Sequence, residues 1–261
     1  MTQILENFYS SVKKNLFVTG DLFILVIELI KASFTRPFYA IKVLEQIISI
    51  GVGSLSITFV IGVAMGLVMT LNFGYGLAKF GGTLYVPAMV SLSIAREMAP
   101  LFTSLLVAGR VGSGIAAEIG SMSVTQQIDA MRALGTSPIR MLVVPRFWAS
   151  VISLPLLSAL SCAMAIIAGL FVCQNEFGMP YGFYFNKVFE TVKFHDYVSG
   201  LVKASIFGAI ISIVGCYRGL NTKDGTRGVG NATTWVVVTS SILILISDFV
   251  ISKIFVLLVT K

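Results

Sequence analysis

Five long apolar runs, separated by more polar segments, organise this chain of 261 residues. Each run is close to the roughly 20 residues that a helix needs to cross the hydrocarbon core of a bilayer. The runs cover roughly residues 47–71, 86–108, 147–173, 197–217 and 234–259. The pattern therefore predicts an all-α integral membrane protein with five transmembrane helices in one domain, residues 47–261.

The N-terminal segment, residues 1–46, has a different pattern. Its apolar core, from Leu22 to Ile27, is too short to span a bilayer comfortably, and Arg36-Pro37 interrupts the segment. Five basic residues surround that core: Lys13, Lys14, Lys31, Arg36 and Lys42. Basic residues beside a short apolar core are typical of a helix that lies on the membrane surface. We therefore expect an interfacial helical segment, with a tilted sixth span as the alternative.

The composition excludes an ordinary soluble domain. Only 12% of the residues are charged and 56% are hydrophobic, whereas soluble domains carry about 25% charged residues. In a membrane protein a net charge of +7 indicates basic cytoplasmic loops rather than nucleic-acid binding. Beyond the N-terminal segment, two loops hold basic clusters: Arg110, Arg132, Arg140 and Arg146, and then Arg218, Lys223 and Arg227. We therefore expect a cytoplasmic N-terminus and, with five spans, a C-terminus on the outer side of the membrane.

The cysteines and the histidine do not suggest a metal site. Cys162, Cys173 and Cys216 fall within or beside apolar runs, and their odd number and irregular spacing argue against a disulfide framework. His195 has no cysteine or second histidine near it and is interpreted as a residue at the boundary of a span. We expect no metal and no other cofactor in this chain.

A pair of glycines predicts close helix packing in the first span. In GVAMG, Gly62 and Gly66 are four residues apart and so lie on one helix face. Small residues at this spacing let two helix backbones approach each other in a membrane. The alternative is a glycine pair of the kind that membrane helices commonly contain.

Two charged residues interrupt the second span, in the stretch SLSIAREMAPLF. Charges at the centre of a bilayer are costly and usually functional, so Arg96 and Glu97 are candidate site residues. Adjacent residues on a helix point about 100° apart, so each is expected to find its partner elsewhere. Asp248, in the last span, is a candidate partner for Arg96, as are a second protomer, water or a lipid headgroup. The two charges either line a substrate cavity, where Arg96 would suit a phosphate, or form ion pairs that hold helices together.

The polar loop over residues 109–146 predicts a short helix. Ser123 and Gln126 match a capping box, and Gly135 suits a helix C-terminus, so we expect a helix over about 124–134. This helix either lies on the membrane surface or couples the chain to a cytoplasmic partner.

The side chains of this short helix have a helical arrangement. Val124, Ile128 and Met131 would form one apolar face. Asp129 and Arg132 lie three residues apart and can form an ion pair on another face.

The glycine-rich segments do not form a nucleotide site. GRVGSG contains Gly109, Gly112 and Gly114, but Ile115 stands where a phosphate-binding loop needs lysine. Energy for uphill transport would have to come from another subunit or an ion gradient.

Residues 108–149, AGRVGSGIAAEIGSMSVTQQIDAMRALGTSPIRMLVVPRFWA, resemble the signature region of the MlaE/YrbE-type permeases, the membrane subunits of bacterial ABC phospholipid transporters. The similarity extends through AREMAPLFTSLLVAGR (95–110), VISLPLL (151–157), KASIFG (203–208) and SDFV (247–250). It covers most of residues 45–257, and the signature itself is a long ungapped match.

The resemblance implies partners and a location. Such permeases are homodimers of five-span subunits in the bacterial inner membrane, each with an N-terminal interfacial helix. Two cytoplasmic ATPase subunits bind ATP and dock on the coupling helix, and a periplasmic MCE-domain protein exchanges phospholipid with the permease.

The resemblance also implies site residues. The family's coupling segment falls on Gln126 to Leu134, including Gln127, Ile128, Asp129, Met131 and Arg132, and Gln127 stands where glutamate is common. Its lipid cavity would have Arg96 and Glu97 as the polar pair and an apolar wall near Met69, Leu77 and Phe80.

Two other classes of function remain as alternatives. An ATP-independent secondary transporter or channel would explain intramembrane charges but not a cytoplasmic docking helix. A lipid-modifying membrane enzyme would need a cluster of nucleophiles, acids or metal ligands, and the sequence suggests none. We therefore expect a non-catalytic membrane subunit.

Overall fold

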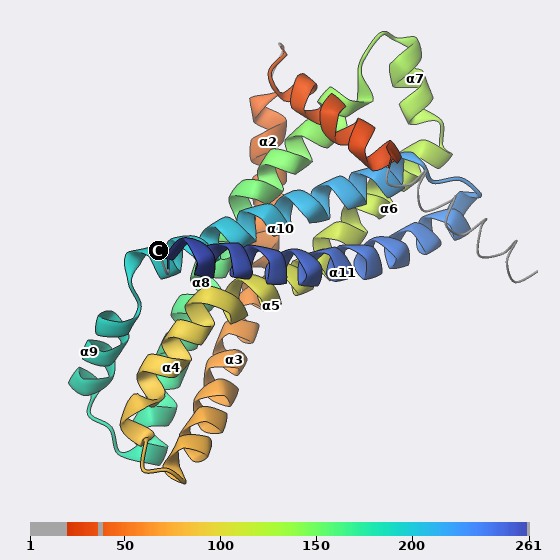
Figure 1. Ribbon diagram of the computed structural model, residues 1–261. Helices are drawn as coiled ribbons and strands as arrows, with labels where there is room; N and C mark the ends of the chain where they lie inside the picture. Colours follow the sequence, from red (N-terminus) through yellow and green to blue (C-terminus); the bar gives the residue numbers. More distant parts are fainter. Residues whose placement is uncertain (1–19, 36–38, 260–261) are drawn as a thin grey trace, which may run out of the picture.

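The described part of the chain, residues 20–35 and 39–259 of a computed structural model, is built from helices and contains no strand. Figure 1 shows an elongated bundle, with α7 (Gln127–Ala133) and α9 (Tyr181–Thr191) near opposite ends. The predicted all-α class is confirmed.

Within the described residues, five continuous helical stretches are long and apolar enough to span a membrane: Ala40–Ala78, Thr83–Val124, Ile139–Phe177, Phe194–Leu220 and Gly225–Phe255. Two of the five are interrupted by π-helical turns and a third begins with one, and such turns commonly mark functional sites. The first consists of α2 (Ala40–Ile47), η1 (Ile48–Val52) and α3 (Gly53–Ala78). The second consists of η2 (Thr83–Tyr85), α4 (Val86–Ser93), η3 (Ile94–Met98), α5 (Ala99–Val107), η4 (Ala108–Gly112) and α6 (Ser113–Val124). The remaining three are η5 (Ile139–Val143) with α8 (Val144–Phe177), then α10 (Phe194–Leu220), and α11 (Gly225–Val259).

The number of spans agrees with the five apolar runs, and the helices extend beyond those runs. The second stretch continues for 16 residues past residue 108, as far as Val124. Its extension, α6, is stabilised by packing on α10 and α11. The added turns are therefore supported by contacts within the protein, which a hydrophobicity pattern does not register.

The N-terminal segment forms a helix over residues 20–33. Leu25 and Leu29 are buried, whereas Phe23 is mostly exposed. The indole N–H of Trp148 donates a hydrogen bond to Ser33 Oγ at 3.3 Å. One face of this helix therefore packs on the bundle. The predicted break at Arg36-Pro37 lies outside the described residues, and the surface location remains a prediction.

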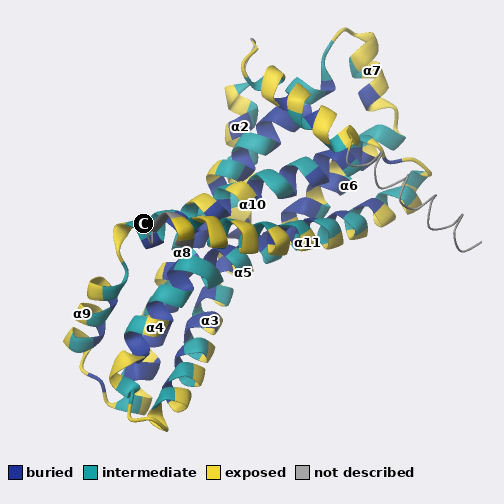
Figure 2. Ribbon diagram, viewed as in Figure 1, coloured by how far each residue is buried: buried dark blue, intermediate teal, exposed yellow. Residues whose placement is uncertain are grey.

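Two large apolar clusters lie in the described part of the bundle, one toward each end, and a third, small cluster joins α6, α10 and α11 (Figure 2). The cluster on the side of α7 includes Phe207 and Ile211, and the cluster on the side of α9 includes Val90 and Tyr184. The middle three spans bury about half of their most apolar stretches, whereas the first and last spans bury only about a fifth. These two outer spans present large apolar surfaces to lipid or to another chain.

The short helix α7 differs from the predicted one. The preceding helix α6 continues to Val124, and the left-handed residue Gln126, with φ 59°, separates it from α7. Ser123 Oγ does not cap α7; it lies 3.2 Å from the carbonyl oxygen of Thr222. The capping-box prediction is therefore wrong, because Ser123 finds its acceptors among the carbonyl groups just beyond α10.

The C-terminus of α7 agrees with the prediction. Gly135 has φ +73°, and its N–H bonds to the carbonyl of Arg132 at 3.0 Å. The N–H of Thr136 bonds to the carbonyl of Met131 at 2.9 Å. This pair of bonds is the Schellman arrangement that ends many helices.

The predicted glycine packing is present between α3 and α8. A Cβ on Gly66 would overlap the carbonyl oxygen of Ala165, and one on Gly62 would lie 2.7 Å from the carbonyl oxygen of Ser161. The two glycines therefore let the backbones of these helices touch, as close-packed membrane helices do.

Gly66→Ala tests this contact. The added methyl group meets backbone, which cannot move aside without separating the helices, and overpacking of this kind costs about 1–3 kcal/mol. We expect a melting temperature several degrees below that of the original chain in detergent. Gly76→Ala on the same helix is the control, because a Cβ there meets nothing within 4 Å. Equal melting temperatures for the two variants would contradict the assigned packing.

Candidate functional site: a charge cluster inside the bundle

The π-helical turn η3 places Arg96 and Glu97 inside the second span. Pro100 has no N–H to donate to the carbonyl of Arg96 four residues earlier. The ammonium group of Lys203 on α10 donates to that carbonyl oxygen instead, at 3.1 Å. This close approach of α10 depends on Gly200, which has no side chain. A Cβ at that position would overlap the carbonyl oxygen of Ala95. Pro100 therefore leaves the carbonyl of Arg96 without its helical N–H donor, and Gly200 lets the fourth span come close enough for Lys203 to bind that carbonyl.

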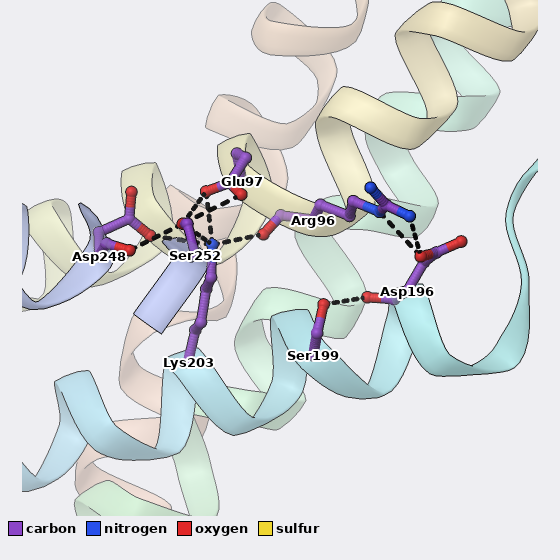
Figure 3. Close-up of polar contacts among 7 residues, drawn as sticks. All are labelled: Arg96, Glu97, Asp196, Ser199, Lys203, Asp248 and Ser252. Carbon is purple, nitrogen blue, oxygen red and sulfur yellow. Dashed lines mark hydrogen bonds and ion pairs between the residues drawn. The ribbon is translucent and has the colours of Figure 1, made fainter. Parts of the chain in front are cut away.

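Arg96 forms an ion pair with Asp196 on the first turn of α10 (Figure 3). Its Nε and Nη2 atoms lie 2.8 Å and 2.5 Å from Asp196 Oδ1. The other carboxylate oxygen of Asp196 accepts the backbone N–H of Lys193 at 3.0 Å. His195, also on the first turn of α10, has Nε2 3.2 Å from Asp196 Oδ1. Asp196 is therefore held from several sides.

Glu97 forms an ion pair with Lys203, whose side chain is 2% exposed. The ammonium group lies 2.5 Å from Glu97 Oε2 and 2.7 Å from Ser252 Oγ on α11. Ser252 Oγ also lies 3.2 Å from both carboxylate oxygens of Glu97. Because lysine has three N–H donors, the bonds to Arg96, Glu97 and Ser252 use all of them.

Asp248 is not the partner of Arg96, contrary to the sequence-based prediction. Its Oδ1 atom lies 3.2 Å from the Lys203 ammonium group. That oxygen accepts no hydrogen bond from the described residues, because the donors of Lys203 point to other atoms. Arg96 and Glu97 point in different directions from their helix, as expected of adjacent residues. Arg96 therefore reaches the carboxylate of Asp196, whereas Glu97 reaches the ammonium group of Lys203.

The cluster is partly exposed. The side chains of Arg96 and Glu97 are 33% and 37% exposed, whereas those of Asp196 and Lys203 are 2% exposed. Arg96 and Glu97 therefore form its accessible surface, and their partners form its buried support.

In a single chain, the residues expected to form the apolar wall of the lipid cavity lie apart from the charge cluster. Leu77 and Phe80 line an open hollow with Asn72 and Phe73, and Met69 lines another with Met65 and Phe102. Arg96 and Glu97 line neither hollow. A single protomer therefore does not bring the expected polar pair and apolar wall into one cavity.

The expected coupling residues divide between two faces of α7. Asp129 and Arg132 form the predicted ion pair at 3.1 Å, on the exposed face. Gln126 and Gln127 are also exposed. A second group packs on the chain's own core: Ile128, which is buried, and Met131, which is partly buried. The apolar face is thus turned inward, and the outward face is polar apart from Leu134 and two alanines.

Sequence reasoning missed three members of the cluster. Asp196, Lys203 and Ser252 complete it. The lysine was detectable, because it interrupts the fourth apolar run as Arg96 interrupts the second. Nothing comparable in the sequence pattern marked Asp196 or Ser252 as a member of the cluster.

Five apolar helices around a buried cluster of charges define a multi-pass helical membrane protein with a polar site in its interior. The family model for the permease MlaE matches residues 43–254. The chain therefore belongs to the MlaE permease family, and it is an ABC transporter permease.

Named relatives agree with this assignment. The chain is 40% identical to a probable ABC transporter permease protein of Rickettsia typhi over 83% of this chain and 84% of the relative. It is 37% identical to another from Synechocystis sp., over 90% of this chain and 87% of the relative. It is 34% identical to the chloroplastic protein TRIGALACTOSYLDIACYLGLYCEROL 1 of Arabidopsis thaliana, over 81% of this chain and 61% of the relative.

Lys203→Met tests the cluster. The change leaves Glu97 and Asp248 without their shared cation, and breaking a buried ion pair costs about 3–5 kcal/mol. We expect a large fall in melting temperature in detergent. Lys187→Met is the control, since Lys187 forms an exposed ion pair with Glu190 on α9 and such pairs contribute about 0–1 kcal/mol. Similar melting temperatures for both variants would show that Lys203 does not organise the interior.

Proposed function

We propose that this chain is the membrane subunit of an ABC transporter that moves phospholipids between the bacterial inner membrane and a periplasmic MCE-domain protein. Two copies of the chain would form the permease, and a separate ATPase would supply the energy. Membership of the MlaE family and the name of the chloroplast relative, which refers to a galactolipid, favour a lipid substrate.

The observation that carries this proposal is the partial exposure of the charge cluster. The side chains of Arg96 and Glu97 are about one third exposed inside the second span. A phospholipid presents a phosphate to an arginine, and the fork of the guanidinium group suits phosphate oxygens. The headgroup would meet Arg96 and Glu97. Its acyl chains would lie against Met69, Leu77 and Phe80 once the second protomer closes the cavity.

The ATPase would bind the exposed face of α7. This face carries Gln126, Gln127, Asp129 and Arg132 at the end of the molecule far from α9 (Figure 1). Ile128 and Met131 would act indirectly, because they fasten α7 to the core. A displacement of α7 by the ATPase would then be transmitted to the membrane-spanning helices through these two side chains.

The proposed orientation places the N-terminus and α7 in the cytoplasm and the C-terminus in the periplasm. The basic residues of the N-terminal segment and of the loops beside α6 and α10 favour this arrangement.

A transport assay tests the lipid role of the cluster. The double variant Arg96→Gln with Asp196→Asn removes an ion pair without leaving either charge unpaired, and Glu97→Gln removes the other exposed charge. We expect each to assemble but to move labelled phospholipid about tenfold more slowly when reconstituted with its ATPase, the effect of losing one charged contact. Lys253→Gln, at an exposed position on α11, is the control. Normal transport by both cluster variants would leave the charges with a structural role alone.

Charge reversal tests the docking face. Arg132→Glu breaks an exposed i,i+3 ion pair and places a negative charge on α7. We expect about tenfold less ATPase to co-purify, as for loss of a charged contact, with unchanged membrane insertion. Lys187→Glu breaks the equivalent exposed pair on α9 and should leave co-purification unchanged. Equal recovery of ATPase with both variants would argue against α7 as the docking site.

A further inference from the structure

An apolar hollow of about 290 Å³ lies between α8, α9 and the start of α10. One face of α8 lines it at helical spacing, with Ala159, Cys162, Ala163 and Ile166. Its volume is at the lower end of the range for ligand pockets, about 300–1,000 Å³. It is distinct from the hollows lined by Met69, Leu77 and Phe80.

The helix α9 holds the hollow open. Tyr184 of α9 is buried and donates a hydrogen bond from its hydroxyl group to the carbonyl of Ile166 at 2.8 Å. The opposite wall of the hollow is formed by Val188, Phe189 and Val192. Because α9 is fastened at Tyr184, the small residues of α8 face a space that no described helix fills.

The rim of the hollow resembles a membrane interface. Phe189 and Phe194 are 77% and 83% exposed, and Lys193 lies beside them. Aromatic residues gather where a protein meets the headgroup layer, and lysine there extends its ammonium group toward the headgroups.

Lys193 has a positive charge available for an anion. The neighbouring carboxylates already have cations, since Asp196 pairs with Arg96 and Glu190 pairs with Lys187. Within the described residues, no carboxylate forms an ion pair with the Lys193 ammonium group. A lipid phosphate at the rim would therefore meet an uncompensated cation.

The floor of the hollow adjoins the charge cluster. Ala95 lines the hollow and precedes Arg96 on η3. Lys193 and Tyr197, which also line it, flank Asp196 at the start of α10. Figure 3 shows Arg96 extended toward this same turn. A ligand in the hollow would lie next to the Arg96–Asp196 ion pair.

We propose that this hollow binds one acyl chain of an anionic phospholipid, with Lys193 at its headgroup, and forms a side entrance to the charge cluster. The inference rests on the proposed lipid transport and adds a second lipid site outside the dimer cavity. An apolar lining, an aromatic rim and an available ammonium group match the acyl chain, the interface and the phosphate of such a lipid.

Native mass spectrometry of the full chain, titrated with phosphatidylglycerol or phosphatidylcholine, tests this site. Ala163→Trp fills the hollow, so one bound lipid per protomer should be lost. Lys193→Glu should weaken binding of phosphatidylglycerol about tenfold, the effect of one charged hydrogen bond, and should weaken phosphatidylcholine less, because the choline cation of that lipid offsets the charge of its phosphate. Ile167→Trp is the control, because Ile167 is an exposed residue of α8 that does not line the hollow.

Three outcomes would overturn the site. Ala163→Trp could retain as many lipids as Ile167→Trp. Lys193→Glu could bind both lipids as the original chain does. Lys193→Cys could cross-link two protomers, which would show that a second copy covers the hollow. None of these results bears on the transport assay with Arg96 and Glu97 variants, so failure of this site is distinguishable from failure of the proposed function. If Ala163→Trp lost this lipid but transported phospholipid at the original rate, the hollow would not be an entrance on the transport route.

Discussion

The buried ammonium group of Lys203 is the interaction on which the polar interior depends. It joins the second span through Glu97 and the carbonyl of Arg96, and the fifth span through Ser252 and Asp248. An ammonium group without these partners would be very costly to bury. The three helices must therefore be in register before the cation is satisfied. Pro100 and Gly200 matter because they expose the carbonyl and allow the close approach.

The cluster is nearly balanced in charge. Its two cations, Arg96 and Lys203, face the carboxylates of Glu97, Asp196 and Asp248, which gives a formal charge of −1 with His195 neutral. Such balance makes charges tolerable inside a membrane. Because these side chains differ in exposure, we infer different roles for them. The buried Asp196 and Lys203 support the site, whereas the partly exposed Arg96 and Glu97 can contact a substrate. Asp248 Oδ1 keeps an unused acceptor beside them.

The sequence predicted the features that depend on local pattern. Apolar runs predicted five spans, Gly62 and Gly66 predicted close packing of the first span, and Gly135 predicted the end of α7. It did not predict which charges pair, because pairing depends on helix register and rotation. Asp196 reaches Arg96 from a span boundary, and Asp248 turns to Lys203. The capping interpretation of Ser123 failed for the same reason, since its acceptors lie beyond α10, about a hundred residues away in the chain.

A charge swap separates support from substrate contact most directly. Arg96→Asp combined with Asp196→Arg keeps an ion pair between the same helices but moves the cation from the exposed position to the buried one. Melting temperature and phospholipid transport would be measured on the swap and on each single variant. The account predicts that the swap recovers much of the stability lost by the single variants while transport stays at least about tenfold reduced. A swap that transports at the original rate would contradict it, because Arg96 would then serve only as a partner for Asp196.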